Sequence, residues 1–263
     1  DQREAQARHD LVEAQEIAAT NDLQVKRLAL EQLVGKSPLQ PRPLAQPVQL
    51  PAVQPATVAP WVEQAENDQP LVRQARLALD MAELETRKAE TGHLPTVDLQ
   101  ASYGVQRNPD GTTTIPIKNR IHQGQVGVTL NMPLFAGFAV QNRVKETLSL
   151  EEKARADLDN ARRQSAQAAR QAFYGVQSGT GQVKALEAAV ASSQSALEAN
   201  QLGYQVGVRI NVDVLNAQSQ LYQAQRDLAQ ARYNVLLGSL RLRQASGALL
   251  PADLQAIDTL LAP

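Results

Sequence analysis

The stretch GYQVGVRINVDVLNAQSQLYQAQRDLAQARYN, residues 203–234, decides the fold of this chain. A glycine-containing turn leads there into a long segment whose small and apolar residues recur at alternating steps of three and four. This period of 3.5 residues is typical of a helix packed along a second helix in a left-handed supercoil. Large and small residues alternate in the seam, so a partner helix can approach closely. The seam residues are Val214, Ala217, Leu221, Ala224, Leu228, Ala231, Val235, Gly238, Leu242 and Ala245.

The composition favours packed helices and excludes several classes of function. Aromatic residues make up only 3% of the 263 residues, fewer than a compact enzyme usually buries. The formal net charge of −1 indicates no basic face for nucleic acid. The chain has no cysteine, which excludes disulfides and thiol catalysis. His9, His93 and His122 lack the spacing of metal ligands, and no nucleophile–base pair or phosphate loop has a supporting context. We expect no enzyme activity, no cofactor and no metal.

Prolines divide the N-terminal quarter of the chain. Residues 1–34 are helical in character and end at Gly35 and Pro38. Repeated prolines exclude a helix over 37–60 and predict a stiff, extended connector. Residues 61–66 are expected to form one or two helical turns.

Three longer helices are expected further on. Asp68 is the predicted N-cap of a helix that runs to about Thr91, with Gly92 as its terminator. No proline interrupts 136–202, which corresponds to roughly 100 Å of helix. The last long helix spans about 212–245. The glycines expected to mark a bend or weak point in 136–202 are Gly175, Gly179 and Gly181.

Two segments of period two predict a β-hairpin. Apolar and polar residues alternate through 96–106 and again through 123–134. The polar, turn-rich residues between them form a long tip loop on this interpretation. Each strand has about ten residues, enough to span a bilayer when tilted.

An alignment of the chain with itself, offset by 212 residues, indicates an internal repeat. It pairs Asp1 with Asp213 and Gly35 with Gly247 without a gap. We interpret the chain as a complete second copy of a duplicated unit, preceded by the last helix of the first copy. We therefore expect a mature fragment that lacks an upstream hairpin and two helices. No signal peptide is visible, and no apolar run reaches the length of about 18 residues that a transmembrane helix needs.

With these features in place, the chain resembles the TolC family of outer-membrane channel-tunnels over nearly its whole length. The resemblance is strongest at GHLPTVDLQAS (92–102), NMPLFAG (131–137), and GYxVGxRxxVDVLNA through to ARYN (203–234). The departures are the missing first half and a longer proline-rich linker at 37–60. The resemblance implies a mainly α fold with a β-hairpin. Long antiparallel coiled-coil helices form an α-barrel tunnel, and the strands belong to a trimeric transmembrane β-barrel.

The resemblance also divides the chain into segments with expected roles. Two tunnel helices and a periplasmic turn at 203–211 occupy 135–247. The remaining segments are the last tunnel helix of the first repeat (1–36), a proline-rich linker with an equatorial segment (37–67), a tunnel helix (68–95), a transmembrane hairpin (96–134) and an equatorial tail (248–263). The strand residues expected to face lipid are Val97, Leu99, Tyr103, Val126, Val128 and Leu130.

The candidate site residues flank the turn before the last helix. Asp213 has two open interpretations: a first-turn carboxylate favoured by the helix dipole, or, by resemblance, one of three carboxylates in a cation-attracting ring at the periplasmic constriction. Asn216 stands where the resemblance expects a second aspartate, so the negative ring is expected to be weaker. Tyr204 and Arg209 would hold the tunnel end shut by contacts to the neighbouring helix pair, with Asp1 as the partner of Tyr204. The plainer interpretation is a packed helix-end tyrosine and a solvated arginine.

Two functions from different classes follow. The first is a passive exit duct of a tripartite efflux or type I secretion system, in the outer membrane of a Gram-negative bacterium with most of the chain in the periplasm. Its expected partners are two further copies in a homotrimer, a periplasmic adaptor, an inner-membrane pump and outer-membrane lipid. The alternative is a non-channel periplasmic coiled-coil scaffold or adaptor, in which the hairpin is a small soluble element. The polar Gln and Thr residues opposite the apolar face favour the channel.

Overall fold

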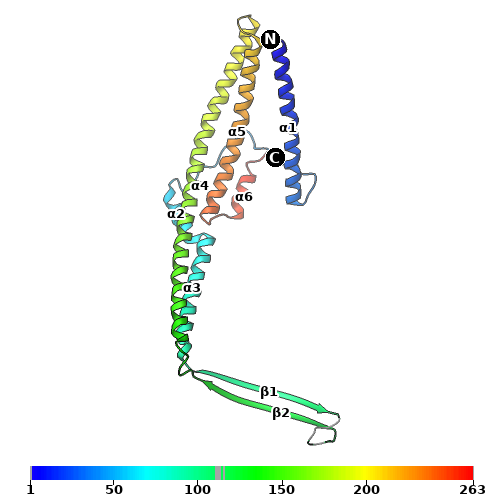
Figure 1. Ribbon diagram of the computed structural model, residues 1–263. Helices are drawn as coiled ribbons and strands as arrows, with labels where there is room; N and C mark the ends of the chain where they lie inside the picture. Colours follow the sequence, from blue (N-terminus) through cyan, green and yellow to red (C-terminus); the bar gives the residue numbers. More distant parts are fainter. Residues whose placement is uncertain (1, 110–113, 115, 263) are drawn as a thin grey trace. The chain divides into compact units, whose positions relative to one another are not determined.

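The computed structural model describes residues 2–109, 114 and 116–262 (Figure 1). Within them, helices and one antiparallel hairpin confirm the predicted fold class. The elements are α1 (Gln2–Val34), α2 (Val58–Asp68), α3 (Pro70–Glu90), β1 (Thr96–Asn108), β2 (Asn119–Asn131), α4 (Ala139–Gln205), α5 (Asn211–Ala245) and α6 (Pro251–Asp258). None of these helices is both long enough and apolar enough to cross a membrane. The chain separates into two compact units, 1–70 with 162–263, and 71–161.

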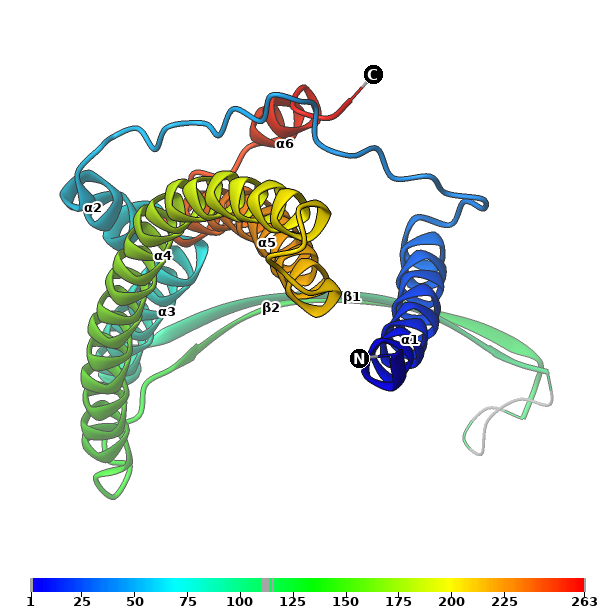
Figure 2. The ribbon, with the colours of Figure 1, turned by 90° about the horizontal axis from the view of Figure 1, so that it is seen from above.

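The seam between α4 and α5 forms the core of the first unit. Both views show α5 lying beside the later part of α4 (Figures 1 and 2). All ten seam residues predicted on α5 are buried or partly buried. Val176 and Val183 of α4 cluster with Leu228, Ala231 and Val235 of α5. The period of 3.5 read from the sequence therefore describes a real helix–helix contact.

Glycines bring α4 and α5 close together. A Cβ atom on Gly179 would lie 2.9 Å from Val235 Cγ2, and one on Gly238 would lie 3.1 Å from Val176 Cγ2. Each helix thus places a valine against a glycine of the other. The helix α4 continues without a break through Gly175, Gly179 and Gly181. The predicted bend or weak point at these glycines stays a prediction.

Left-handed glycines end three of the helices. Gly207 (φ +82) follows α4 and Gly247 (φ +75) follows α5, each in a Schellman arrangement of two backbone hydrogen bonds. After α5 these bonds are Gly247 N–H to Gln244 O (3.1 Å) and Ala248 N–H to Arg243 O (2.8 Å). Gly35 (φ +71) ends α1. Gly35 and Gly247, paired by the sequence repeat, therefore adopt the same backbone conformation.

The boundary between α2 and α3 differs from the prediction. Asp68 is the last residue of α2 and not the N-cap of α3, and α2 is longer than the expected one or two turns. The break falls on Gln69, whose ψ of 130° is extended. The following Pro70 explains this, because a proline disfavours helical geometry in the residue before it and suits the first helical position. Gly92 lies in a short 3₁₀ turn, Thr91–His93, after α3.

The proline-rich segment pairs with the C-terminal tail. Leu44 and Leu261 form an isolated antiparallel bridge, flanked by Ala45 N–H to Leu260 O (2.9 Å) and Ala262 N–H to Pro43 O (2.8 Å). Further along, the segment covers the first unit's core, where Trp61 of α2 is buried with Phe173 and Leu242. The sequence predicted an extended connector without helix over 37–60, and residues 37–57 contain no helix. The prediction is wrong for 58–60, because α2 begins at Val58 and a proline is tolerated in the first turn of a helix. The assignment of both segments to an equatorial domain stays a prediction.

The start of this segment carries a pH-sensitive link. A Glu31 carboxylate oxygen of α1 accepts a hydrogen bond from the backbone N–H of Leu39 (3.0 Å). That bond, followed by one from the Ser37 side chain, lowers the pKa of Glu31 below its ordinary value of 4.5. A group with a lowered pKa stabilises the fold above its unfolded value and loses that contribution as the pH falls through the folded one.

We therefore expect Glu31→Gln to reduce hydrogen-exchange protection of the Leu39 amide at neutral pH. The wild-type protein should lose the same protection only below pH 4.5. The matched control is Glu16→Gln, on an exposed position of the same helix. Equal loss of protection in both variants would contradict the assigned link.

Candidate functional site

The turn from α4 to α5 is built around Gly203. Its carbonyl accepts hydrogen bonds from the N–H groups of Val208 (2.9 Å) and Arg209 (3.1 Å). A Cβ atom at Gly203 would lie 2.6 Å from Arg209 Cγ. Glycine at 203 therefore lets Arg209 fold back over the end of α4, and left-handed Gly207 reverses the chain so that α5 can return along α4.

Asp213 occupies the first turn of α5, as its plainer interpretation predicted. Its carboxylate accepts a weak hydrogen bond from the N–H of Ile210 (3.5 Å), which satisfies one of the free donors of a helix N-terminus. Arg209 Nη1 lies 3.8 Å from the same oxygen, Oδ2. The Asp213 side chain remains 36% exposed. The carboxylate is thus positioned by its own helix and partly neutralised within the same chain.

The other candidate gate residues lie around this turn. Tyr204 stands in the last turn of α4 and is exposed. Asn216 is exposed one turn after Asp213, on the same face of α5 by its spacing of three. Asp1 lies outside the described residues, so its expected contact with Tyr204 stays a prediction. The sequence analysis missed the Arg209–Asp213 ion pair, although their spacing of four residues is a signal that could have indicated it.

The hairpin of the second unit has two chemically distinct faces. Val97 pairs with Leu130 and Leu99 with Val128. Side chains alternate along a strand, so directly paired residues share a face. This register places all the predicted lipid-facing residues together. That face comprises Val97, Leu99, Ala101, Tyr103 and Val105 of β1 with His122, Gly124, Val126, Val128 and Leu130 of β2. The opposite face is mainly polar, with Asp98, Gln100, Ser102, Gln106, Gln123, Gln125 and Thr129.

Both strands are longer than predicted. β1 and β2 have 13 residues each, and pairing continues from Thr96 with Asn131 to Asn108 with Asn119. β2 ends before Met132 and Leu134, which were expected to belong to it, because Pro133 has no N–H to continue the ladder. The apolar face is exposed throughout, with Leu99 at 74% and Val126 at 77%.

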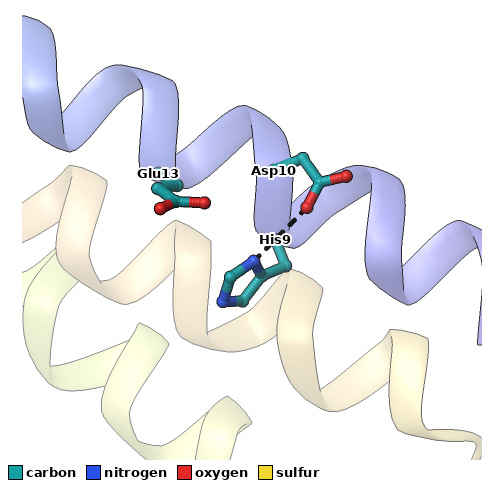
Figure 3. Close-up of side chains that lie close together, drawn as sticks. All are labelled: His9, Asp10 and Glu13. Atoms are coloured by element: carbon teal, nitrogen blue, oxygen red, sulfur yellow. Dashed lines mark ion pairs between the residues drawn. The ribbon is translucent and has the colours of Figure 1, made fainter.

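Three side chains of residue types that commonly bind metal ions lie close together on α1, where no metal site was expected. Ligand atoms of His9, Asp10 and Glu13 come within 4.8 Å of one another, and His9 Nδ1 lies 3.5 Å from Asp10 Oδ1 (Figure 3). The sequence analysis compared only the histidines with one another and so overlooked the i, i+4 spacing of His9 and Glu13. All three side chains are exposed and come from a single helix, which does not by itself make a metal site. The absence of a metal role stays a prediction.

The hairpin, the long helices and the turn between them all lie within one match to a protein family. The family described as outer membrane efflux protein matches residues 61–248, which include the hairpin, the long helices and the turn between them. The chain belongs to the outer membrane efflux protein family. This member is 34% identical over 269 residues to outer membrane protein TolC of Escherichia coli K12, covering 99% of this chain and 54% of TolC. It is 32% identical to the alkaline protease secretion protein AprF of Pseudomonas aeruginosa, covering 98% of this chain and 53% of AprF.

Solved structures share the fold of this outer membrane efflux family member. The outer membrane protein VceC of Vibrio cholerae superposes with a TM-score of 0.69 at 20% identity, covering 93% of this chain and 57% of VceC. The open state of the Neisseria gonorrhoeae MtrE outer membrane channel gives a TM-score of 0.67 at 19% identity, covering 89% of this chain and 52% of MtrE. The chain thus spans about half the length of the relatives it matches. The resemblance stated from the sequence is confirmed.

Proposed function

We propose that this chain forms part of a passive exit duct for efflux or type I secretion in the outer membrane of a Gram-negative bacterium. The duct is a homotrimer, and most of the chain lies in the periplasm. A periplasmic adaptor and an inner-membrane pump serve it, and the pump supplies the energy. The observation that carries the proposal is the register of the hairpin, which gathers the apolar side chains of both strands, apart from Ile121, on one exposed face. The relatives named TolC and AprF, an outer membrane protein and a protease secretion protein, support it.

The apolar face has the dimensions of a membrane strand. From Val97 to Val105, β1 covers about 26 Å at roughly 3.3 Å per residue. A tilt of about 40° reduces this to roughly 20 Å, which covers most of the apolar band of about 25 Å in outer-membrane barrels. A two-stranded sheet has two open edges, which hydrocarbon does not tolerate. Strands from outside this hairpin must therefore complete a closed barrel.

The scaffold alternative explains the long helices equally well but not the hairpin. A soluble hairpin would cover its apolar face with protein, and an uncovered face of this kind promotes aggregation in water. In a barrel, the same face contacts lipid and the polar face lines the lumen. We therefore favour the duct.

In the proposed duct, Asp213 forms the cation-attracting ring of the periplasmic gate, and Arg209 moderates it. Three copies of Asp213 would approach one another around the threefold axis, where carboxylates bind cations and repel anions. Asn216 adds no charge. Within each copy, the Arg209 guanidinium offsets part of the negative field. Tyr204 and Arg209 are proposed to contact the neighbouring helix pair when the gate is closed.

Single-channel recording in planar bilayers of the intact trimeric protein tests the duct and its gate. We expect Asp213→Asn to weaken block by a multivalent cation roughly tenfold, or about 1.4 kcal/mol of lost cation binding. Arg209→Gln should act in the opposite direction and strengthen block, because it removes the partner cation. Asp227→Asn, further along α5, is the matched control and should leave block unchanged. A properly trimeric protein that never conducts would leave the scaffold as the better interpretation.

A further inference from the structure

Two arginines face each other across the hairpin near its tip. Arg107 of β1 pairs directly with Arg120 of β2, so both side chains lie on the same side of the sheet as the apolar face, two residues beyond Val105 and His122. Like charges at directly opposed positions destabilise a sheet. Both side chains are exposed, and among the described residues neither guanidinium forms an ion pair. The only acidic residue of the two strands, Asp98, lies on the other face. Within the two strands, no carboxylate shares the face of these two adjacent cations.

The position of this arginine pair follows the order of chemical layers in a lipid leaflet. The purely apolar pairs end at Ala101 with Val126. Tyr103 comes next, and its hydroxyl is hydrogen-bonded to His122 Nδ1 (2.7 Å). The Arg107–Arg120 pair follows two residues beyond the Val105–His122 pair, about 7 Å further along the strands. The apolar residues correspond to the hydrocarbon layer of the membrane, the aromatic residue to the membrane–water interface, and the cationic residues to the layer of lipid headgroups.

We propose that Arg107 and Arg120 together bind a phosphate group of a lipid headgroup in the outer leaflet. Guanidinium groups bind phosphate with two parallel hydrogen bonds, and two of them on one face can hold the same phosphate. Opposed residues of an antiparallel pair are about 5 Å apart at Cα, which brings both side chains within reach of one group. The proposal rests on the proposed membrane span of the hairpin. It adds a binding site for a lipid phosphate at the end of the lipid-facing surface that lies nearest the hairpin tip.

Native mass spectrometry of the intact detergent-purified trimer tests this proposal. The probes are diphosphorylated lipid A, its fully dephosphorylated form, and inorganic phosphate alone. We expect the wild-type protein to retain the phosphorylated lipid roughly tenfold or more tightly than the dephosphorylated one. Arg107→Gln/Arg120→Gln should lose most of that preference. Arg76→Gln/Arg87→Gln, with the same loss of charge on α3, should keep it.

Equal retention of phosphorylated lipid by the two double variants would overturn the proposal. If the hairpin variant fails to assemble, the wild-type comparison decides, because equal binding of phosphorylated and dephosphorylated lipid also overturns it. Binding of inorganic phosphate without lipid binding would overturn the assignment to a headgroup. Measuring the conductance of the same wild-type preparation separates failure of the lipid-phosphate site from failure of the duct. A conducting trimer without arginine-dependent lipid binding refutes only this inference, whereas a non-conducting trimer refutes the duct.

Discussion

Replacing Gly247 by alanine is expected to lower the free energy of unfolding by about 2–4 kcal/mol, the largest effect of any substitution considered. Two costs add at this position. Gly247 has a φ of +75°, where a residue with a Cβ atom loses about 1–2 kcal/mol. The new Cβ would also lie 2.9 Å from both the Asp68 carbonyl oxygen and Gln69 Cα. These are backbone atoms at the break between α2 and α3, and they cannot rotate away.

The matched control for this prediction is Gly35→Ala. Gly35 has nearly the same φ, +71°, but in the described structure no atom beyond the glycine and its two chain neighbours lies within 4 Å of the place that a Cβ atom would take there. Its substitution should cost only the conformational strain, about 1–2 kcal/mol. Urea unfolding of the detergent-solubilised protein, followed by helical circular dichroism, gives both values. Equal losses for the two variants would show that the collision with Asp68 and Gln69 has no energetic weight.

Gly179→Ala is expected to destabilise the α4–α5 seam by about 1–3 kcal/mol. Alanine normally favours a helix over glycine, so the loss must come from packing. The added methyl group would meet Val235 Cγ2 at 2.9 Å. Val235 is buried, and a β-branched side chain in a helix has one strongly preferred rotamer. The helices must therefore separate, or Val235 must leave its rotamer.

Gly181→Ala, two residues further along α4, is expected to change the stability in the opposite direction. In the described structure no atom beyond the neighbouring residues and the nearby backbone of α4 itself lies within 4 Å of a Cβ at Gly181. The substitution should stabilise the helix by up to about 1 kcal/mol. Thermal unfolding measured on both variants tests the reversal of sign. If Gly179→Ala stabilised the protein as much as Gly181→Ala, the close approach of the two helices would be refuted.

The sequence predicted those parts of the fold that depend on local periodicity. The 3.5-residue period located the α5 seam, and the two-residue period located both strands. The boundary at Asp68 was wrong because an acidic residue before an apolar run resembles an N-cap, while Pro70 had the stronger effect on its neighbour. The pairing of Leu44 with Leu261 was beyond sequence reasoning from the residues alone, because it joins segments more than 200 positions apart.

The candidate site was predictable in its location but not in its contacts. The glycines around 203–207 and the acidic residue after them indicated the turn. The fold-back of Arg209 over Gly203, and its ion pair with Asp213, depend on backbone geometry that residue spacing does not specify. The proposed roles of Tyr204, Asn216 and Asp213 in a closed gate involve neighbouring copies of the chain. Such contacts depend on an assembly, and one chain's sequence carries no direct record of their geometry.

The reciprocal contacts of Gly179 with Val235 and Gly238 with Val176 fix the axial alignment of α4 and α5. Sliding one helix by a full turn, about 5.4 Å, would move each valine away from its glycine, and in either direction Val176 would face a larger residue, Asn234 or Leu242. We therefore expect the paired stretch of the two helices to move as one stiff body. Any widening at the 203–213 end would then move this body as a whole, and the energy of opening would reside at its ends and in contacts with neighbouring helix pairs, not within the pair.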